Sequence, residues 1–290
     1  MPTPIIATLT PVPDVVARIL EVLGHEPSAL LSDFDGTLSP IAPTPEAAFL
    51  HPDLVHILPA LEQKAPLFGI ITGRAVADAR HKLGAEGMLV VGNHGLEWFD
   101  GGEYRAHPAG LAAEQAIVDA IAGIEEDLKG LDRDLTGIVF ENKRLSASIH
   151  YRLVADPETF DEPLAAITQK HADAFGLRMT TGKMMVELRP AARVSKGSAV
   201  EEIVASRGLR GAVFLGDDVT DVDAFLAITR LRDSGALAAG LSVGVLSADT
   251  NPAIVETADV LVRDVNEVAA VFTELAARLP DRDPAKEDQA

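Results

Sequence analysis

Short apolar runs alternate with amphipathic segments along the first third of the chain. The apolar run that ends at Asp33 is followed by Gly36 and two prolines, which is typical of a buried strand leading into a loop. Spacing of the apolar residues predicts further strands over 67–71 and 88–91, and helices over 14–23, 52–64 and 74–83. Helices placed between apolar strands favour parallel βαβ units.

The pattern changes after residue 95. Residues 96–99 and 103–105 flank Asp100-Gly101-Gly102, a hairpin signal, and 109–182 predict a mixed α+β segment. Regular alternation then resumes, with helices over 197–206, 221–231 and 266–279 and strands over 212–215, 242–245 and 260–262. We therefore predict an α/β fold, a doubly wound parallel sheet with an α+β module inserted between its third and fourth strands.

This organisation divides the chain into five predicted segments. They are an N-terminal arm and helix (1–28), a first part of the core (29–108), an inserted α+β cap (109–185), a second part of the core (186–279) and a charged, disordered tail (280–290). Prolines in the opening residues, with no basic residue before Arg18, argue against a signal peptide. No apolar stretch is long enough to cross a bilayer, so no membrane association is expected.

Composition narrows the possible partners. The 290 residues are 47% hydrophobic and 24% charged, as in ordinary globular proteins, and the formal net charge of −19 disfavours nucleic acid. The absence of cysteine excludes disulfides, thiol nucleophiles and thiolate metal sites, and favours the cytoplasm. Residues 141–196 are the exception to the acidic balance, with nine Lys/Arg against seven Asp/Glu, so an anionic substrate could bind there.

Two acidic motifs follow apolar strands. Asp33 and Asp35 stand at positions i and i+2, so both carboxylates face one way at a strand end where ligands of open parallel sheets bind. A bare DxD is usually a surface turn, but DxDGT after an apolar strand is more specific. The second motif, FLGDDVTDVDAF, places four carboxylates within seven residues, which indicates a hard divalent cation such as Mg²⁺.

Two further elements could hold a phosphate. Thr72-Gly73-Arg74 follows a strand and begins a helix, where backbone N–H groups favour an anion. Lys196 immediately precedes another predicted helix. Either element alone is weak, because a single lysine at a helix start is usually a surface residue.

Together and in this order, the four elements resemble the motifs of the haloacid dehalogenase (HAD) superfamily. The resemblance implies a HAD-like Rossmannoid core in which Asp33 is the nucleophile and Asp35 the general acid and base. It implies that Thr72 and Lys196 hold the phosphoryl oxygens. It also implies that Mg²⁺ is bound by Asp33, the Asp35 carbonyl and Asp217. The carboxylates of Asp218 and Asp221 would support these ligands.

Further segments are similar to those of trehalose-6-phosphate phosphatases. These are GNHG at 92–95, ENK at 141–143 with HYR at 150–152, and ELRP at 187–190. The resemblance implies hydrolysis of trehalose 6-phosphate in trehalose biosynthesis, with possible association with the synthase that makes this substrate. It assigns substrate binding to Gly73, Arg74, Asn93, His94, Glu141, Lys143, Arg152, Lys183 and Glu187.

Other functions stay open at this point. Related sugar phosphatases act on sucrose 6-phosphate or a glycosyl-phosphoglycerate, and the same fold can serve as a non-catalytic sugar-phosphate-binding module. Loss of the nucleophile or of the general acid would favour the last alternative, but Asp33, Asp35, Lys196 and Asp217 are all present. A receiver domain also uses an acidic pocket, yet it is far shorter and lacks an insertion.

Overall fold

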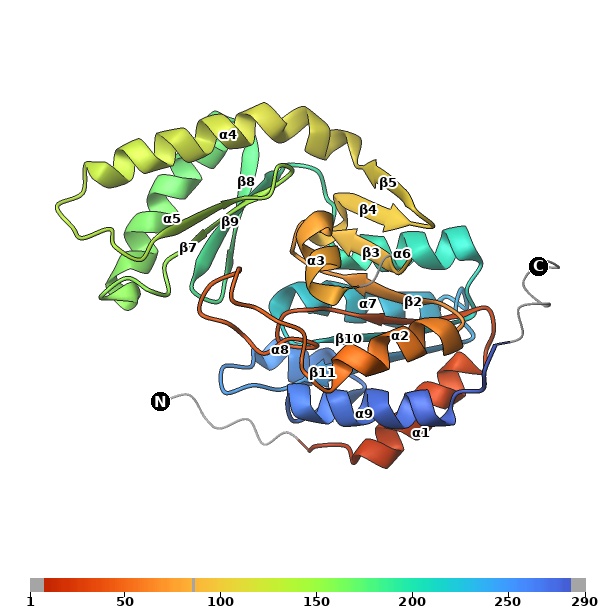
Figure 1. The fold of residues 1–290 in the computed structure, drawn as a ribbon. Helices are drawn as coiled ribbons and strands as arrows, with labels where there is room; N and C mark the ends of the chain where they lie inside the picture. Colours follow the sequence, from red (N-terminus) through yellow and green to blue (C-terminus); the bar gives the residue numbers. More distant parts are fainter. Residues whose placement is uncertain (1–7, 85–86, 283–290) are drawn as a thin grey trace.

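Two β-sheets organise the chain (Figure 1). The main sheet has eight strands in the order β12-β11-β10-β1-β2-β3-β4-β5, and the second has four in the order β6-β7-β9-β8. The structure, a computed structural model, describes residues 8–84 and 87–282. Residues 1–7 of the predicted arm and 283–290 of the predicted disordered tail lie outside the described residues.

The main sheet places its central strand where the winding reverses. β1 pairs in parallel with β10 on one side and with β2 on the other, whereas β4 and β5 extend one edge as an antiparallel hairpin. Ligands of open α/β sheets bind at the carboxyl ends of strands beside such a reversal. The strands are β1 (Ser28–Ser32), β2 (Phe68–Ile71), β3 (Leu89–Gly92), β4 (Glu97–Asp100), β5 (Glu103–Ala106), β10 (Gly211–Gly216), β11 (Ala239–Val245) and β12 (Val260–Val262).

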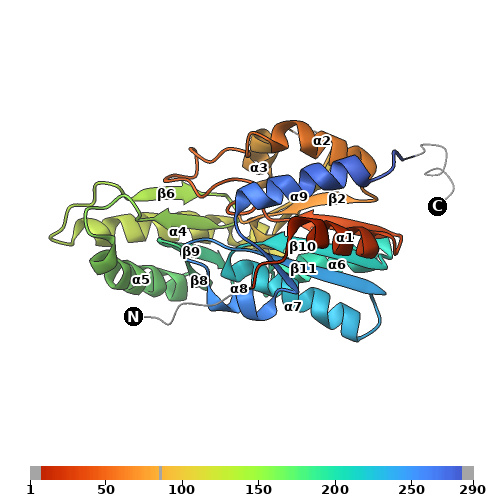
Figure 2. The ribbon, with the colours of Figure 1, turned by 90° about the horizontal axis from the view of Figure 1, so that it is seen from below.

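Helices cover both faces of this sheet (Figure 2). One layer holds α1 (Val12–Leu23), α2 (Leu54–Lys64), α3 (Val76–Leu83) and α9 (Val265–Arg278), and the other holds α6 (Lys196–Arg207), α7 (Val219–Asp233) and α8 (Pro252–Thr257). Successive residues of β1 enter different cores, since Leu30 packs under the first layer and Leu31 under the second. Burial on both faces explains why the parallel strands are continuous apolar runs.

The second sheet belongs to an insertion between β5 and α6. Its strands β6 (Val139–Asn142), β7 (Ala147–His150), β8 (Leu177–Gly182) and β9 (Met185–Pro190) are antiparallel. Helices α4 (Pro108–Lys129) and α5 (Pro157–Ala174) pack on one face and share an apolar core with it. We call residues 108–190 the insertion. The other face of its sheet is turned toward the carboxyl ends of β1 and β10 (Figure 1).

The predicted fold class is confirmed, with two corrections. The insertion follows the fifth strand of the main sheet and not the third, because the hairpin of β4 and β5 joins that sheet beside β3. One boundary also changes. The boundary expected at residue 185 would cut the small sheet, because β9 pairs with β7 and β8 as far as Pro190. The sequence conceals this strand, since its polar positions include charged residues that turn out to be buried. With the boundary moved to 190, the division into core and cap remains our proposal. Among the described helices, none has the length and apolar character that crossing a membrane would require.

Candidate active site

Three strand ends meet at the middle of the main sheet's carboxyl edge. Asp33 follows β1, Thr72 follows β2 and Asp217 follows β10, and β1 lies between the other two strands. The Asp33 amide donates to the Leu215 carbonyl at 2.9 Å, which continues the β1–β10 pairing one residue further. Parallel pairing therefore brings together motifs that are far apart in the sequence.

Lys196, the first residue of α6, links the acidic groups. Its ammonium lies 2.8 Å from Asp33 Oδ1 and 2.6 Å from Asp221 Oδ1. The other Asp221 oxygen accepts hydrogen bonds from the amides of Asp217 and Asp218, both at 3.0 Å. Asp221 thus fixes the lysine and the backbone of the second acidic motif, and both of its oxygens are occupied.

Burial shifts the pKa values of this cluster. It raises the pKa of Asp33 well above its usual range, against the attraction of Lys196. It also raises the pKa of Asp217 to about 7, although the Lys183 charge opposes the rise. For Lys196, burial lowers the pKa, but the Asp221 and Asp33 charges outweigh it and the net shift is upward. A bound cation would favour the ionised carboxylates and reduce their mutual repulsion.

The oxygen groups of the cluster fit a divalent cation. Asp33, Asp217 and Asp221 each have a carboxylate oxygen within 4.8 Å of the other two, although both Asp221 oxygens already accept hydrogen bonds. Asp217 Oδ1 is buried and has no hydrogen-bond partner among the residues that the structure describes. Gly36, at φ +80°, leaves room for that carboxylate, because a Cβ there would collide with it. Mg²⁺ prefers such carboxylate oxygens, so these residues suit it.

Arg74 orients Asp35. Its guanidinium donates to both oxygens of Asp35, at 2.6 Å from Nε and 2.8 Å from Nη2. Nη1 donates to Asp78 Oδ2 at 2.6 Å and to the Pro45 carbonyl at 3.1 Å. The planar, bidentate pair holds the Asp35 carboxylate at the rim of the cavity and leaves the guanidinium few donors for a substrate.

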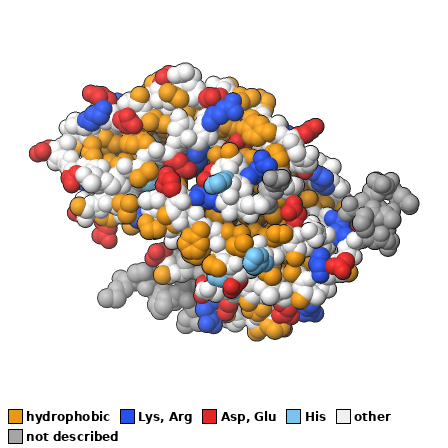
Figure 3. Space-filling view, viewed as in Figure 1, with side chains coloured by type: hydrophobic (Ala, Val, Ile, Leu, Met, Phe, Trp, Pro, Cys, Tyr) orange, Lys and Arg blue, Asp and Glu red, His pale blue; other side chains and the backbone are white. Residues whose placement is uncertain are grey.

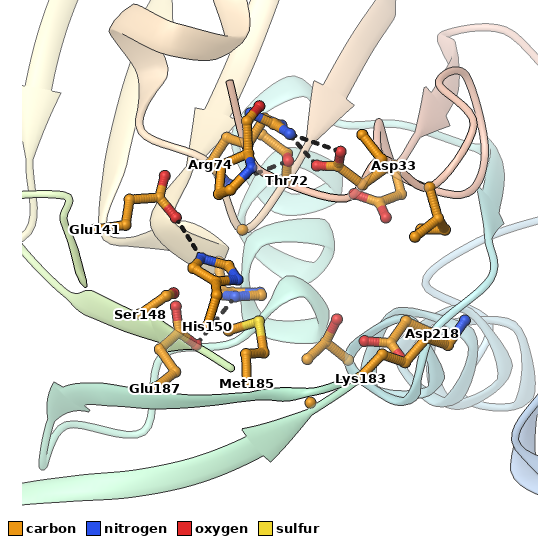
Figure 4. A pocket seen from close by; sticks show the side chains of 18 of the residues that line it. Asp33, Thr72, Arg74, Glu141, Ser148, His150, Lys183, Met185, Glu187 and Asp218 are labelled. Atoms are coloured by element: carbon orange, nitrogen blue, oxygen red, sulfur yellow. Dashed lines mark hydrogen bonds and ion pairs between the residues drawn. The ribbon is translucent and has the colours of Figure 1, made fainter. Parts of the chain in front are cut away.

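The insertion's sheet presents a row of polar side chains toward these strand ends. In the strand register, Glu141 lies beside Ser148, Ser148 beside Glu187, and Glu187 beside Thr180. We call these four residues the polar row. Figure 4 shows Glu141, Ser148 and Glu187 on the side of the cavity opposite Asp33.

Glu187 makes buried contacts with both the insertion and the core. Its Oε1 accepts a hydrogen bond from Lys143 Nζ at 2.6 Å, and its Oε2 lies 3.3 Å from His94 Nε2. Lys143 also donates to the Gly73 carbonyl at 3.0 Å, which ties the insertion to the core. Burial raises the pKa of Glu187, but Lys143, His94 and Arg189 together outweigh burial and hold that pKa well below its usual range. Burial lowers the pKa of His94 to about 4, so its ring is neutral near pH 7.

Asn93 lies behind the cavity and joins the two parts of the chain. Its Oδ1 accepts from Ser146 Oγ at 2.5 Å, and its Nδ2 donates to Glu97 Oε1 at 2.6 Å and to the Lys143 carbonyl at 3.3 Å. Asn93 and His94 have φ values of 47° and 56°, in the left-handed region that asparagine and histidine enter more readily than most residues. The Asn93 amide is therefore fully used by protein partners.

Most of the predicted site residues line one cavity between insertion and core. Asn93 and Asp221 do not line it, and the others do: Asp33, Asp35, Thr72, Gly73, Arg74, His94, Glu141, Lys143, Arg152, Lys183, Glu187, Lys196, Asp217 and Asp218. Charged side chains gather where the insertion meets the core in Figure 3.

Several lining residues were not assigned from the sequence. They include Ser148, His150, Thr180, Met185 and the loop 41–45. Strand alternation was the signal for two of them, because Ser148 and His150 lie on one face of β7 while Ala147 and Ile149 enter the insertion's core. Nothing in the local sequence places the loop 41–45 at the cavity.

A parallel α/β sheet, a buried lysine between two acidic motifs at the strand ends and an inserted α+β module define the phosphatase class of the HAD superfamily. The chain belongs to the trehalose-phosphatase family, which it matches over residues 31–253. That range covers the insertion and most of the main sheet. The resemblance inferred from the motifs is therefore confirmed at the level of the family.

Individual relatives agree with this assignment. An uncharacterized glycosyl hydrolase of Mycobacterium tuberculosis is 36% identical over 233 residues, which are 77% of this chain and 17% of that protein. The trehalose-phosphate phosphatase of the same organism is 31% identical over 255 residues, 82% of this chain and 62% of that protein. This chain thus spans only part of the length of either relative. The C-terminal domain of C. albicans trehalose-6-phosphate phosphatase shares the fold, with a TM-score of 0.75 at 22% identity over 93% of this chain and 98% of that one.

Proposed function

We propose that this protein hydrolyses trehalose 6-phosphate to trehalose and phosphate in a Mg²⁺-dependent reaction. One observation carries the proposal: a single cavity joins the Asp33, Lys196 and Asp217 cluster of the core to the polar row of the insertion. The first half suits a phosphoryl group, and the second suits the hydroxyls of a sugar.

Asp33 is the proposed nucleophile. One of its oxygens bonds to phosphorus while the bond from phosphorus to the sugar oxygen breaks, giving an aspartyl-phosphate and a sugar alkoxide that takes a proton from Asp35. Water then attacks the same phosphorus and gives a proton back to Asp35. The bond between phosphorus and the Asp33 oxygen breaks, so phosphate leaves and Asp33 is restored. Arg74 positions the Asp35 carboxylate but occupies both of its oxygens, so one of these hydrogen bonds must break before Asp35 can carry the proton.

Charge neutralisation is the main task of the remaining core residues. Lys196 is buried and lies 2.8 Å from Asp33, so its ammonium can contact the transferring phosphoryl oxygens together with the Thr72 hydroxyl. Mg²⁺, held by Asp33, the Asp35 carbonyl and Asp217, would supply the charge that lets a carboxylate approach a phosphate dianion. Asp218 and Asp221 support that site from behind.

The insertion favours a neutral sugar. Glu187 stays ionised near pH 7, and the His150 hydrogen bond and Lys143 charge likewise lower the pKa of Glu141 despite its burial. Carboxylates accept hydrogen bonds from sugar hydroxyls, and the ammonium groups of Lys143 and Lys183 donate to them. A phosphoglycerate tail brings its own carboxylate, which the two glutamates would repel. Sucrose 6-phosphate carries no charge outside its phosphate, so it is the nearest competitor.

Phosphate release from a panel of compounds tests the proposal. The panel holds trehalose 6-phosphate, sucrose 6-phosphate, glucose 6-phosphate, a glycosyl-phosphoglycerate and an aryl phosphate, each with Mg²⁺ and with excess EDTA. The expected result is Mg²⁺-dependent release with the highest kcat/KM for trehalose 6-phosphate. Preference for another sugar would overturn the substrate, and no release from any compound would favour a sugar-phosphate-binding module.

A further inference from the structure

The hydroxyl of Ser148 is buried without a hydrogen bond inside the proposed sugar subsite. The residue is 1% exposed, and its Oγ has no partner among the residues that the structure describes. It nevertheless lines the cavity, between Glu141 and Glu187 and across from Asp33 (Figure 4). Buried polar groups are nearly always paired, so an unpaired one at a cavity indicates a missing ligand group.

Its cross-strand neighbours do not satisfy this hydroxyl. Glu141 Oε2 lies 3.0 Å from His150 Nε2, and Glu187 Oε1 accepts a hydrogen bond from Lys143 Nζ at 2.6 Å. Strand alternation turns Ser148 away from the insertion's apolar core, which Ala147 and Ile149 enter from the same strand. An alanine at position 148 would pack equally well on this face, so packing alone does not explain the serine.

The chemistry of the row explains what a serine adds. Carboxylates only accept hydrogen bonds and ammonium groups only donate them, whereas a serine hydroxyl does both. Neighbouring strands are about 4.8 Å apart, so Ser148 stands within reach of a sugar hydroxyl that also contacts either adjacent glutamate. A hydroxyl that donates to a glutamate can accept from Ser148 at the same time.

We propose that Ser148 determines sugar specificity by hydrogen bonding a hydroxyl of the ring remote from the phosphate. This inference rests on the proposed function, because it takes the polar row as the sugar subsite. Ser148 touches neither the phosphoryl group nor the nucleophile, so its contribution concerns recognition of the sugar. A substrate without the second ring leaves the hydroxyl unpaired, as it is in the free protein.

Ser148→Ala tests the inference, with Thr168→Val as the matched control. Thr168, on α5, is also fully buried with an unpartnered hydroxyl, but it does not line the cavity. Neither substitution removes an existing hydrogen bond, so both proteins should unfold at or slightly above the wild-type Tm. Ser148→Ala alone should weaken binding of trehalose, measured by calorimetry, about tenfold, equivalent to about 1.4 kcal/mol.

The kinetic readout is the ratio of kcat/KM for trehalose 6-phosphate to that for an aryl phosphate. Ser148→Ala should lower this ratio about tenfold through KM, whereas Thr168→Val should leave it unchanged. An unchanged ratio and unchanged trehalose affinity in Ser148→Ala overturn the inference, as does an equal loss on both substrates together with a lower Tm. The proposed function fails separately, in the wild-type protein, if another sugar phosphate is preferred; the two variants are then compared on that sugar.

Discussion

Lys183 Nζ lies 3.0 Å from Asp217 Oδ2, so the turn between β8 and β9 places an ammonium group on a carboxylate at the end of β10. The lysine belongs to the insertion and the aspartate to the core. Burial lowers the pKa of Lys183, but the charge and hydrogen bond of Asp217, together with the charges of Asp218 and Asp249, outweigh burial and raise that pKa. The insertion thus supplies a positive charge to the same carboxylate that we expect to bind Mg²⁺.

Replacing Lys183 should therefore tighten metal binding. In the wild-type protein an incoming Mg²⁺ must displace the ammonium group or lie beside it, and two unit charges about 4 Å apart interact by roughly 4 kcal/mol near a protein surface. Solvent screens part of this repulsion. We expect the Mg²⁺ affinity of Lys183→Met to rise about tenfold in calorimetric titrations without substrate, which is about 1.4 kcal/mol.

Lys170→Met controls for the change in net charge. Lys170, on α5, pairs with Asp127 of α4 at 2.7 Å and does not line the cavity. Equal tightening in both variants would mean that the overall charge, and not the Lys183–Asp217 contact, sets the affinity. Weaker Mg²⁺ binding in Lys183→Met would contradict the competition outright.

Asp33→Asn should abolish turnover while the protein stays folded. Asparagine has the same shape but cannot form the aspartyl-phosphate, so phosphate release should fall by at least about a thousandfold. Lys196 keeps its 2.6 Å partner Asp221, and burial already disfavours the ionised form of Asp33, so the Tm should not drop greatly. Near wild-type release from this variant, or full activity of the wild type in EDTA, would remove the mechanism.

The insertion should move as a lid, because a reacting phosphoryl group must be shielded from water after the substrate enters. Contacts such as Lys143 to the Gly73 carbonyl and Ser146 to Asn93 would have to break and reform. We expect hinges near residues 107–110 and 182–193. The chain has no cysteine, so a pair introduced on α4 and α9, Glu126→Cys and Ala277→Cys, can carry two fluorophores without competing labels.

The distance between these fluorophores should shorten when trehalose binds together with a phosphate analogue. Ser146→Ala removes the hydrogen bond to Asn93 and should lengthen the mean distance in the ligand-free protein. Identical distances with and without ligand, in a site that remains open to water, would rule out the lid.

His94 should make stability fall in mild acid. Burial lowers its pKa from 6.5 to about 4, so the folded state resists protonation and the unfolded state accepts it. Above pH 6.5 the neutral His94 does not lower the free energy of unfolding. As the pH falls from 6.5 toward 4, protonation of the unfolded state lowers that free energy by up to about 3 kcal/mol. His94→Asn, which suits the left-handed backbone, should lack this part of the pH dependence in urea unfolding at pH 7, 6 and 5. Parallel curves for the two proteins would contradict it.

Much of the core could be predicted from the sequence because burial there matches local chemistry. Continuous apolar runs specify β1, β2 and β10, and the polar residues that follow each of them mark the carboxyl edge of the sheet. The order of the motifs was then enough to bring Asp33, Thr72 and Asp217 together. No long-range information beyond parallel pairing was needed.

The insertion was harder because burial there contradicts local chemistry. Glu187 and Arg189 are almost fully buried on β9, although alternating charged residues usually indicate a solvated strand. Their burial depends on Lys143, His94 and other partners distant in the sequence, which no local pattern reveals. The burial of Arg74 also depends on a partner distant in the sequence. That partner is Asp35, which the pairing of β1 with β2 brings close.

Discrimination between disaccharides should come from the polar row. Trehalose 6-phosphate and sucrose 6-phosphate each carry one phosphate on an otherwise uncharged disaccharide, so overall charge does not separate them. A buried polar group left unpaired costs roughly 1–3 kcal/mol, and kcat/KM should therefore favour trehalose 6-phosphate by about tenfold for each pairing that the competitor loses. Kinetics on the wild-type protein check this directly.

Glu187→Ala should narrow that preference. The substitution removes the acceptor that holds Lys143 at 2.6 Å and leaves a buried ammonium group without its carboxylate, so recognition of every sugar weakens and the best substrate loses most. Glu187→Gln keeps the size and one acceptor, and it should retain more of the preference. Because Glu187 lies across the cavity from Asp33, the ratio of sugar phosphate to aryl phosphate hydrolysis should fall in both variants. If Glu187→Ala instead slows both reactions equally, Glu187 acts on the phosphoryl transfer itself and the polar row does not select the sugar.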